Sequence, residues 1–241
     1  MAKNDWLPLF IFTVAKAPPS WYDDGGDRMD ILYEDKELLV CIKPMGVLSE
    51  TGGMPELLRE ATGHDSFFCV HRLDRAVGGL MVYAKTREAA ASLSSQIAAG
   101  KLEKDYLAVV HGQPEAQGVM KDLLFHDAAR NKSYVVKRMR KGVREAELSF
   151  RVLADKDGLS LVRIQLKTGR SHQIRVQFAS RGMPLVGDSL YGSPCRNSRI
   201  ALWSESLSFV HPKTGKKLHR AAPPPDSWPW TLFPGLTQQD P

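Results

Sequence analysis

Cysteine is scarce in this 241-residue chain: Cys41, Cys69 and Cys195 are the only three, and no two stand at CxxC spacing. This scarcity argues against a disulfide framework and a structural zinc site, and it fits a reducing compartment. The seven histidines form no HExxH pattern, and the GxGxxG, GxxxxGK(S/T) and GxSxG motifs are absent. Zinc peptidases, dinucleotide-binding enzymes, P-loop NTPases and α/β-hydrolases therefore lack their sequence signatures here, and we expect no metal.

Long hydrophobic runs are also missing. The best candidate for a targeting segment, residues 6–15, is too short to span a bilayer. A signal peptide would have basic residues ahead of it, and here Lys3 is offset by Asp5. We interpret this stretch as a strand or docking arm, and we expect a cytoplasmic protein that does not enter a membrane.

Positive charge is in moderate excess, with 33 Lys and Arg against 27 Asp and Glu, a net charge of +6. Residues 130–144 hold seven basic residues and no acidic one, interrupted by Tyr134 and two valines. Such a run is compatible with a solvated surface, and equally with a basic strand and loop that lie against phosphates. An anionic partner, RNA among the candidates, is therefore expected without being decided by charge alone.

Apolar runs that suit strands outnumber those that suit helices, and hairpin-like turns separate many of them. Helices are predicted at residues 54–62, 87–100 and 171–182, with Thr86 and Ser171 as N-caps. The pattern predicts an α+β fold on a largely antiparallel, twisted mixed β-sheet with flanking helices. We expect residues 1–28 to form an N-terminal arm and linker and residues 234–241 a flexible tail.

Residues 71–79, His-Arg-Leu-Asp-Arg-Ala-Val-Gly-Gly, lie between two apolar runs that suit buried strands. We expect a loop here, with Gly78 and Gly79 making its sharp bend. Its carboxylate, Asp74, stands between two arginines, which stabilise an ionised carboxylate and favour a nucleophile or base over an acid. These residues alone also describe an aspartate that caps a turn, so both interpretations stay open at this point.

A second polar segment, residues 167–175, joins several cations to a predicted helix start. Arg170 would lie on the entry loop, while Arg175 would point from the second helical turn. Free amides at a helix N-terminus attract anions, and neighbouring cations strengthen the attraction. A phosphate-binding corner and an ordinary surface cap both fit this pattern.

Five motifs occur in order over residues 29–225 and together resemble the RluA-type family of RNA pseudouridine synthases. They are Lys43-Pro44-x-Gly46, His71-Arg72-Leu73-Asp74, Lys104-x-Tyr106-x-Ala108-x-Val110-x-Gly112, residues 167–176, and Gly182-x-Pro184-Leu185-Val186-Gly187-Asp188-x-x-Tyr191-Gly192. The resemblance implies the pseudouridine synthase catalytic fold over residues 29–233. It also implies an isomerase that converts specific uridines in structured RNA, rRNA or tRNA, to pseudouridine without a cofactor.

The same resemblance implies roles for individual residues. Asp74 would be the catalytic nucleophile, Arg175 would pair with it and keep it charged, and Tyr106 would lie against the target base and assist proton transfer at carbon 5. Arg72 would fill the space left by the flipped nucleotide, whose extrusion costs about a few kcal/mol. The expected substrate-binding set is Arg72, Lys167, Arg170 and His172.

The chain departs from the family pattern in three places. Val77-Gly78-Gly79 stands where Thr-Ser-Gly is usual, which removes hydroxyls beside the active loop. Lys167 stands where Arg is common, a mild change, and Trp203-Ser204 stands where His-Ala is usual. The missing hydroxyls leave open a catalytically idle RNA-binding module or RNA chaperone on the same scaffold. A third hypothesis, a nuclease, would use His71, His172 and Arg170. Residues 1–28 are too few for an S4-type RNA-binding domain, so we expect the catalytic domain to select the target RNA. We also expect the protein to be a monomer.

Overall fold

The computed structural model describes residues 29–235; the predicted arm and linker, and all but the first two residues of the predicted tail, lie outside the described residues. The strands are β1 (Ile31–Glu34), β2 (Leu38–Lys43), β3 (Phe68–Cys69), β4 (Gly78–Ala84), β5 (Glu103–His111), β6 (Gln117–Asp127), β7 (Lys132–Val136), β8 (Val143–Lys156), β9 (Leu159–Leu166), β10 (Leu202–Val210) and β11 (Lys217–Ala221). The helices are α1 (Met54–Thr62), α2 (Arg87–Ala98) and α3 (Gln173–Ala179), with short 3-10 turns η1 (Ser189–Tyr191) and η2 (Trp230–Leu232).

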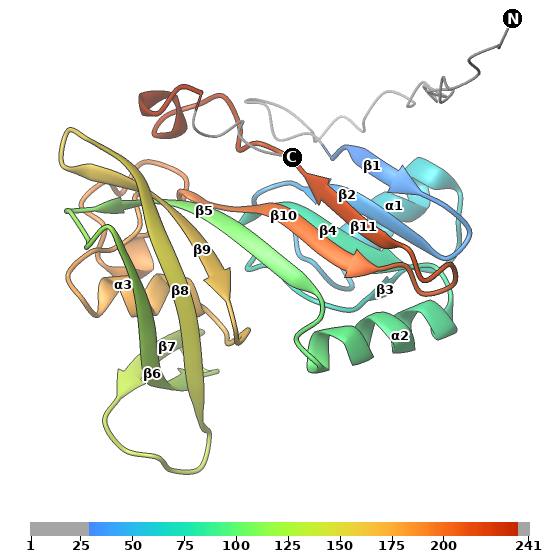
Figure 1. The fold of residues 1–241 in the computed structure, drawn as a ribbon, viewed down its shortest axis with the longest axis horizontal. Helices are drawn as coiled ribbons and strands as arrows, with labels where there is room; N and C mark the ends of the chain where they lie inside the picture. The colour runs from blue at the N-terminus through green and yellow to red at the C-terminus, as the bar shows by residue number, and fades with distance from the viewer. Residues whose placement is uncertain (1–28, 236–241) are drawn as a thin grey trace, which may run out of the picture.

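Over residues 29–235 the strands form one sheet in the order β1-β2-β4-β10-β5-β9-β8-β6-β7, with β11 beside β10 and β3 beside β4 (Figure 1). Of the strand pairs in this part of the chain, β4 and β10 run parallel and the others antiparallel. The β8–β9 turn places Asp157 and Gly158 at φ 53° and 74°, the left-handed pair that tight hairpins need. The predicted α+β fold with a largely antiparallel sheet is confirmed.

The central strands are buried on both faces, which explains their continuous apolar runs. In β4, Met81 and Tyr83 join a core with α1 and α3, whereas Leu80 and Val82 on the other face join a core with α2. In β5, Tyr106 lies on the first face and Leu107 packs on the other, against Trp203 and Trp230. Because successive side chains of a strand alternate between faces, the β5 residues two positions before and after Tyr106 lie on the same face as Tyr106.

The three predicted helices are present; α2 ends at Ala98, two residues before its predicted end at Gly100, and α3 differs at both ends. Thr86 caps α2 as expected, with its Oγ1 accepting from the Ala89 amide at 3.1 Å. In α3 the N-cap is His172, in the left-handed conformation at φ 55°, so the prediction of Ser171 was wrong. The Ser171 carbonyl accepts from the Ser133 hydroxyl at 2.6 Å, which ties the residue before this N-cap to β7. The helix also ends at Ala179, three residues before the predicted stop at Gly182.

Gly78 and Gly79 are the first two residues of β4, fully inside the sheet, and not the bend of the loop before it. Their register explains the difference: Gly78 lies beside Trp203 and Gly79 beside Ser204 in the parallel β4–β10 pair. A β-carbon on Gly79, at φ +115°, would lie 2.4 Å from the Ser204 carbonyl oxygen. Glycine is therefore required by close strand packing rather than by a turn.

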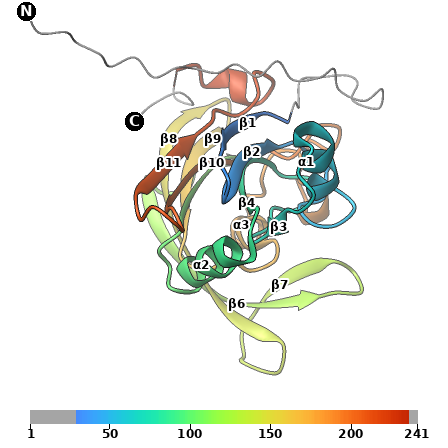
Figure 2. The ribbon, with the colours of Figure 1, turned by 90° about the vertical axis from the view of Figure 1, so that its right-hand side faces the viewer.

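The basic run of residues 130–144 forms β7 and the loop that leads into β8, as the strand-and-loop interpretation predicted. Together with β6 it makes an arm that extends away from the body of the sheet (Figure 2). Along residues 29–235, no helix is long and apolar enough to cross a membrane.

Candidate active site

The loop that carries Asp74 is held by its neighbours on both sides. The Ser49 hydroxyl accepts from the Leu73 amide at 3.0 Å and donates to the Leu73 carbonyl at 2.8 Å. The Val77 amide closes a turn onto the Asp74 carbonyl at 2.9 Å. These bonds fix the backbone on either side of the carboxylate, which stays 27% exposed.

Lys43 also holds the Asp74 loop in place. Its side chain is fully buried, and its ammonium donates to the carbonyls of Pro44 and Val47 at 2.8 Å and of Arg75 at 3.3 Å. A buried cation is tolerated where backbone oxygens replace its water. Lys43 therefore joins the β2 end to the Asp74 loop rather than facing a ligand.

Arg175 connects this loop to α3, a hundred residues further along the chain. Its Nη1 donates to Asp74 Oδ2 at 3.0 Å, while Nε and Nη2 bind the two oxygens of Asp188 at 2.7 and 2.8 Å. Burial would lower the pKa of Arg175, but the hydrogen bonds and charges of Asp188 and Asp74 raise it. The guanidinium is thus permanently charged, and its two-point bond to buried Asp188 fixes the direction of Nη1.

His172 completes the wall beside the carboxylate. Its Nε2 lies 3.7 Å from Asp74 Oδ2, and its Nδ1 lies 3.0 Å from the Tyr191 hydroxyl. Burial lowers the pKa of His172, and the charge of Asp74 opposes this while that of Arg175 adds to it. The ring is therefore neutral at physiological pH and acts as a hydrogen-bonding group beside Asp74.

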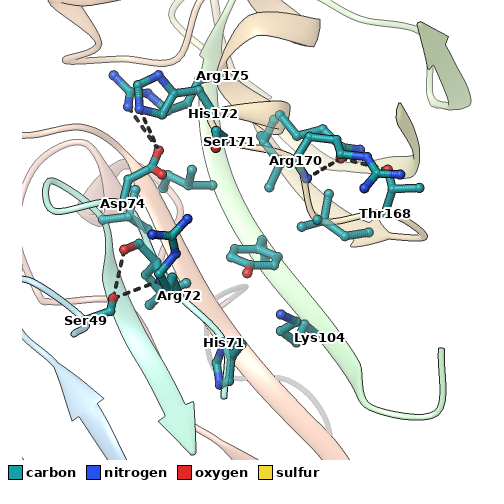
Figure 3. Close-up of a pocket in the computed structure, with 18 of the residues that line it drawn as sticks. Ser49, His71, Arg72, Asp74, Lys104, Thr168, Arg170, Ser171, His172 and Arg175 are labelled. Atoms are coloured by element: carbon teal, nitrogen blue, oxygen red, sulfur yellow. Dashed lines mark hydrogen bonds and ion pairs between the residues drawn. The ribbon is translucent and has the colours of Figure 1, made fainter. Parts of the chain in front are cut away.

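These groups open onto a cavity of about 750 Å³ whose walls come from the Asp74 loop, β5 and the segment before α3 (Figure 3). Tyr106 forms one wall; burial, with a further contribution from the charge of Asp74, raises the pKa of its phenol, so it is protonated. At the rim, Arg72 pairs with Glu50 at 3.3 Å, and its side chain is 63% exposed. The volume is in the range of ordinary ligand sites.

The structure brings all the predicted site residues to this one cavity. The residues that line it include Arg72, Asp74, Tyr106, Lys167, Arg170, His172 and Arg175. Lys167 pairs with Glu147 at 3.2 Å, and Arg170 Nε donates to the Glu145 carbonyl at 2.8 Å, so both are held at the rim by β8. The predicted contact between Arg175 and Asp74 is present.

Sequence reasoning missed two supporting residues, Asp188 and Tyr191. Asp188 orients Arg175, and Tyr191 lies under its guanidinium, 5.1 Å from ring centroid to Cζ. Both stand in the last of the five motifs, which was the only available signal. Neither lies in a periodic segment, so nothing local indicated that they would reach α3. In the described part of the chain no group of three or more His, Cys, Asp or Glu could hold a metal ion.

Known proteins resemble this chain in both sequence and fold. The sequence model of the family described as RNA pseudouridylate synthase matches residues 37–180. The chain belongs to this family. It is therefore an RNA pseudouridine synthase, as the resemblance of the five motifs predicted.

Two curated relatives show how far the likeness extends. This pseudouridine synthase is 35% identical over 210 residues to ribosomal large subunit pseudouridine synthase C of Buchnera aphidicola (subsp. Schizaphis graminum), covering 80% of this chain and 67% of that protein. It is 34% identical over 202 residues to dual-specificity RNA pseudouridine synthase RluA of Yersinia pestis, covering 79% of this chain and 97% of that one. Among solved structures, human RNA pseudouridylate synthase domain containing 1 has a TM-score of 0.69 at 22% identity, over 84% of this chain and 86% of that one, which supports the fold.

Proposed function

We propose that this enzyme isomerises specific uridines in structured RNA, with Asp74 as the nucleophile on a flipped-out uridine. The observation that carries the proposal is the ion pair of Asp74 with Arg175 at the wall of a cavity with cations at its rim. A partly exposed, ionised carboxylate is free to attack, because Arg175 is held by Asp188 rather than by Asp74 alone. Ribosomal RNA is the favoured substrate and tRNA the other one, because relatives are named for the ribosomal large subunit and for dual specificity.

The overall reaction breaks the bond between N1 of uracil and the ribose and forms one between C5 and the same ribose carbon. The C5 proton is lost and N1 gains a proton, so the sum is an isomerisation that needs no cofactor. In this proposal Tyr106 lies against the base and its hydroxyl serves the proton transfer at C5. Arg72 takes the place of the extruded nucleotide in the RNA stack. Lys167, Arg170 and His172 bind the RNA around it.

A catalytically idle RNA-binding module is the second candidate, because hydroxyls usual in the family are missing beside the loop. The structure weakens its basis. Val77 lines the cavity, but Gly78 is not among the described residues that do so, since it packs inside the sheet against Trp203. The lost Ser hydroxyl at position 78 would thus not have faced the substrate.

The test is site-resolved pseudouridine mapping in cells that lack the native gene, complemented with wild type, Asp74→Asn or Asp65→Asn. Asp65 is an exposed carboxylate outside the cavity and serves as the matched control. We expect wild type and Asp65→Asn to restore the modification and Asp74→Asn to leave it missing. Full restoration by Asp74→Asn would end the proposed role of Asp74. With purified protein and RNA carrying tritium at uridine C5, an idle module binds RNA without tritium release, and a nuclease would cut the chain.

A further inference from the structure

One cation in the cavity differs from the others in having no partner. Among the described residues that line it, every other Lys or Arg side chain has one: Arg72 with Glu50, Arg75 with the Gly46 carbonyl, Lys167 with Glu147, Arg170 with the Glu145 carbonyl, and Arg175 with Asp74 and Asp188. Lys104 lines the same cavity, and within residues 29–235 its ammonium has no hydrogen-bond or ion-pair partner. An unpaired, partly buried ammonium is costly, so its retention needs an explanation.

Lys104 lies on β5 two residues before Tyr106, and the pleat therefore turns both side chains to the cavity face. In Figure 3, Lys104 and His71 lie at one end of the labelled residues and Arg175 and His172 at the other, with Arg72 between them. The cavity thus has two ends. Asp74 marks the end where the base would react, and Lys104 marks the other.

At the Lys104 end of the cavity, the described residues offer the ammonium no acceptor. Burial lowers the pKa of Lys104 to about 8, as expected where water is removed and no carboxylate replaces it. His71 beside it does not compensate, because burial and the charge of Lys104 lower its own pKa and keep it neutral. His71 Nε2 accepts from the Val82 amide, so the proton sits on Nδ1, which is buried without a partner. Both neighbouring groups therefore lack an electron-rich partner.

We infer that Lys104 binds a backbone phosphate of the RNA, next to the nucleotide that enters the cavity toward Asp74. This rests on the proposed function only in taking RNA as the ligand. A phosphodiester supplies the missing negative charge, which a neutral uracil carbonyl cannot, and RNA carries one at every nucleotide. A contact of this kind positions the strand without reading its sequence. The exposed cations at the rim already have partners within the protein. The ammonium of Lys104 does not, so its charge is available to a phosphate of the RNA.

The experiment compares wild type, Lys104→Met, Lys104→Arg and Lys101→Met in binding a labelled RNA hairpin with a uridine-rich loop, over a series of salt concentrations. Lys101 is exposed, lies three residues away and does not line the cavity, so it controls for the general loss of one positive charge. For single strands the slope of log affinity against log salt is negative, and each phosphate contact that is removed makes it shallower by about 0.7. We expect Lys104→Met to lose about that much slope, with weaker binding, and Lys104→Arg and Lys101→Met to keep the wild-type slope.

Two further readouts separate a phosphate contact from other roles. Removing an uncompensated buried charge raises the melting temperature, so Lys104→Met is expected to melt higher than wild type, and Lys101→Met at the same temperature. A set of hairpins, each with one phosphate replaced by a neutral methylphosphonate, locates the contact. At one position the replacement should make the salt dependence of wild-type binding shallower and leave that of Lys104→Met unchanged. An unchanged slope in Lys104→Met, or a lower melting temperature, would overturn the inference. If wild type binds as described but makes no pseudouridine, the proposed function fails while the Lys104 contact stands.

Discussion

The benzene ring of Trp203 occupies the space that a side chain at position 78 would need: a β-carbon on Gly78 would lie 2.5 Å from Trp203 Cζ3. The two residues are paired across the parallel β4–β10 contact. Gly78 and Trp203 each stand where the resemblance implies a different residue, and they form one packing arrangement. The Trp203 indole also donates to the Ala222 carbonyl at 2.9 Å, which fixes the ring in that place.

The first prediction concerns this pair. Gly78→Ala should lower the free energy of unfolding by about 1–3 kcal/mol, because the sheet is overpacked at the new methyl group. In a Trp203→Leu background the same change should cost clearly less, and chemical denaturation of the four proteins in the cycle measures the difference. Gly169→Ala is the control: a β-carbon there meets nothing within 4 Å, so a change within about 0.5 kcal/mol is expected. Equal losses in both backgrounds would show that Trp203 is not the obstacle.

The second prediction concerns Asp188, which does not line the cavity and binds Arg175, which does. Asp188→Asn should lower the free energy of unfolding by about 3 kcal/mol, because it leaves a buried guanidinium half paired. Turnover should fall as well, since Arg175 loses the two-point bond that aims it at Asp74. Arg59→Met breaks an exposed pair with Glu56 and should change stability by about 1 kcal/mol or less. Normal turnover in folded Asp188→Asn would contradict the positioning role.

The third prediction separates the ring of Tyr106 from its hydroxyl. The hydroxyl makes no hydrogen bond within the described residues, although the side chain is only 4% exposed. Tyr106→Phe should therefore fold as well as wild type and bind RNA with similar affinity, while kcat falls about 10²-fold or more through loss of proton transfer. Single-turnover assays with tritium at uridine C5 measure the step directly. A kcat within a few-fold of wild type would limit Tyr106 to stacking.

The fourth prediction is a pH dependence at a site remote from the cavity. Burial alone would raise the pKa of Asp35, but hydrogen bonds from the Leu38 and Glu37 amides, His211 and Tyr33 lower it to about 2 from an ordinary value of 3.8. A carboxylate with a lowered folded-state pKa stabilises the fold above the unfolded value, and this contribution is lost as pH falls through the folded one. Asp35→Asn should thus cost up to about 2 kcal/mol at neutral pH.

That difference between Asp35→Asn and wild type should shrink as the pH falls from about 4 toward 2. Urea denaturation of both proteins over the acid range in which wild type stays folded provides the measurement. A gap that stays constant with pH would mean that Asp35 acts through packing and not through its charge.

Much of the fold and of the site could be predicted from local features of the sequence. Buried strands were visible as short apolar runs because both faces of the sheet are covered, and hairpins such as Asp155–Gly158 were visible because tight turns restrict residue type. The motifs named the family and placed Asp74, Tyr106 and Arg175 in one site. Local signals sufficed wherever a residue's role is set by its immediate neighbours in the chain.

The remaining features could not be predicted, because they depend on contacts between residues far apart in the sequence. Gly78 and Gly79 lie in a strand, where they pack against Trp203 and Ser204. The N-cap of α3 is His172, next to a Ser171 carbonyl that accepts from the Ser133 hydroxyl of a distant strand. Asp188 became a supporting group only when α3 brought Arg175 to it. Lys104 is ordinary as a residue of β5. Folding buries it beside His71, and no carboxylate among residues 29–235 pairs with it.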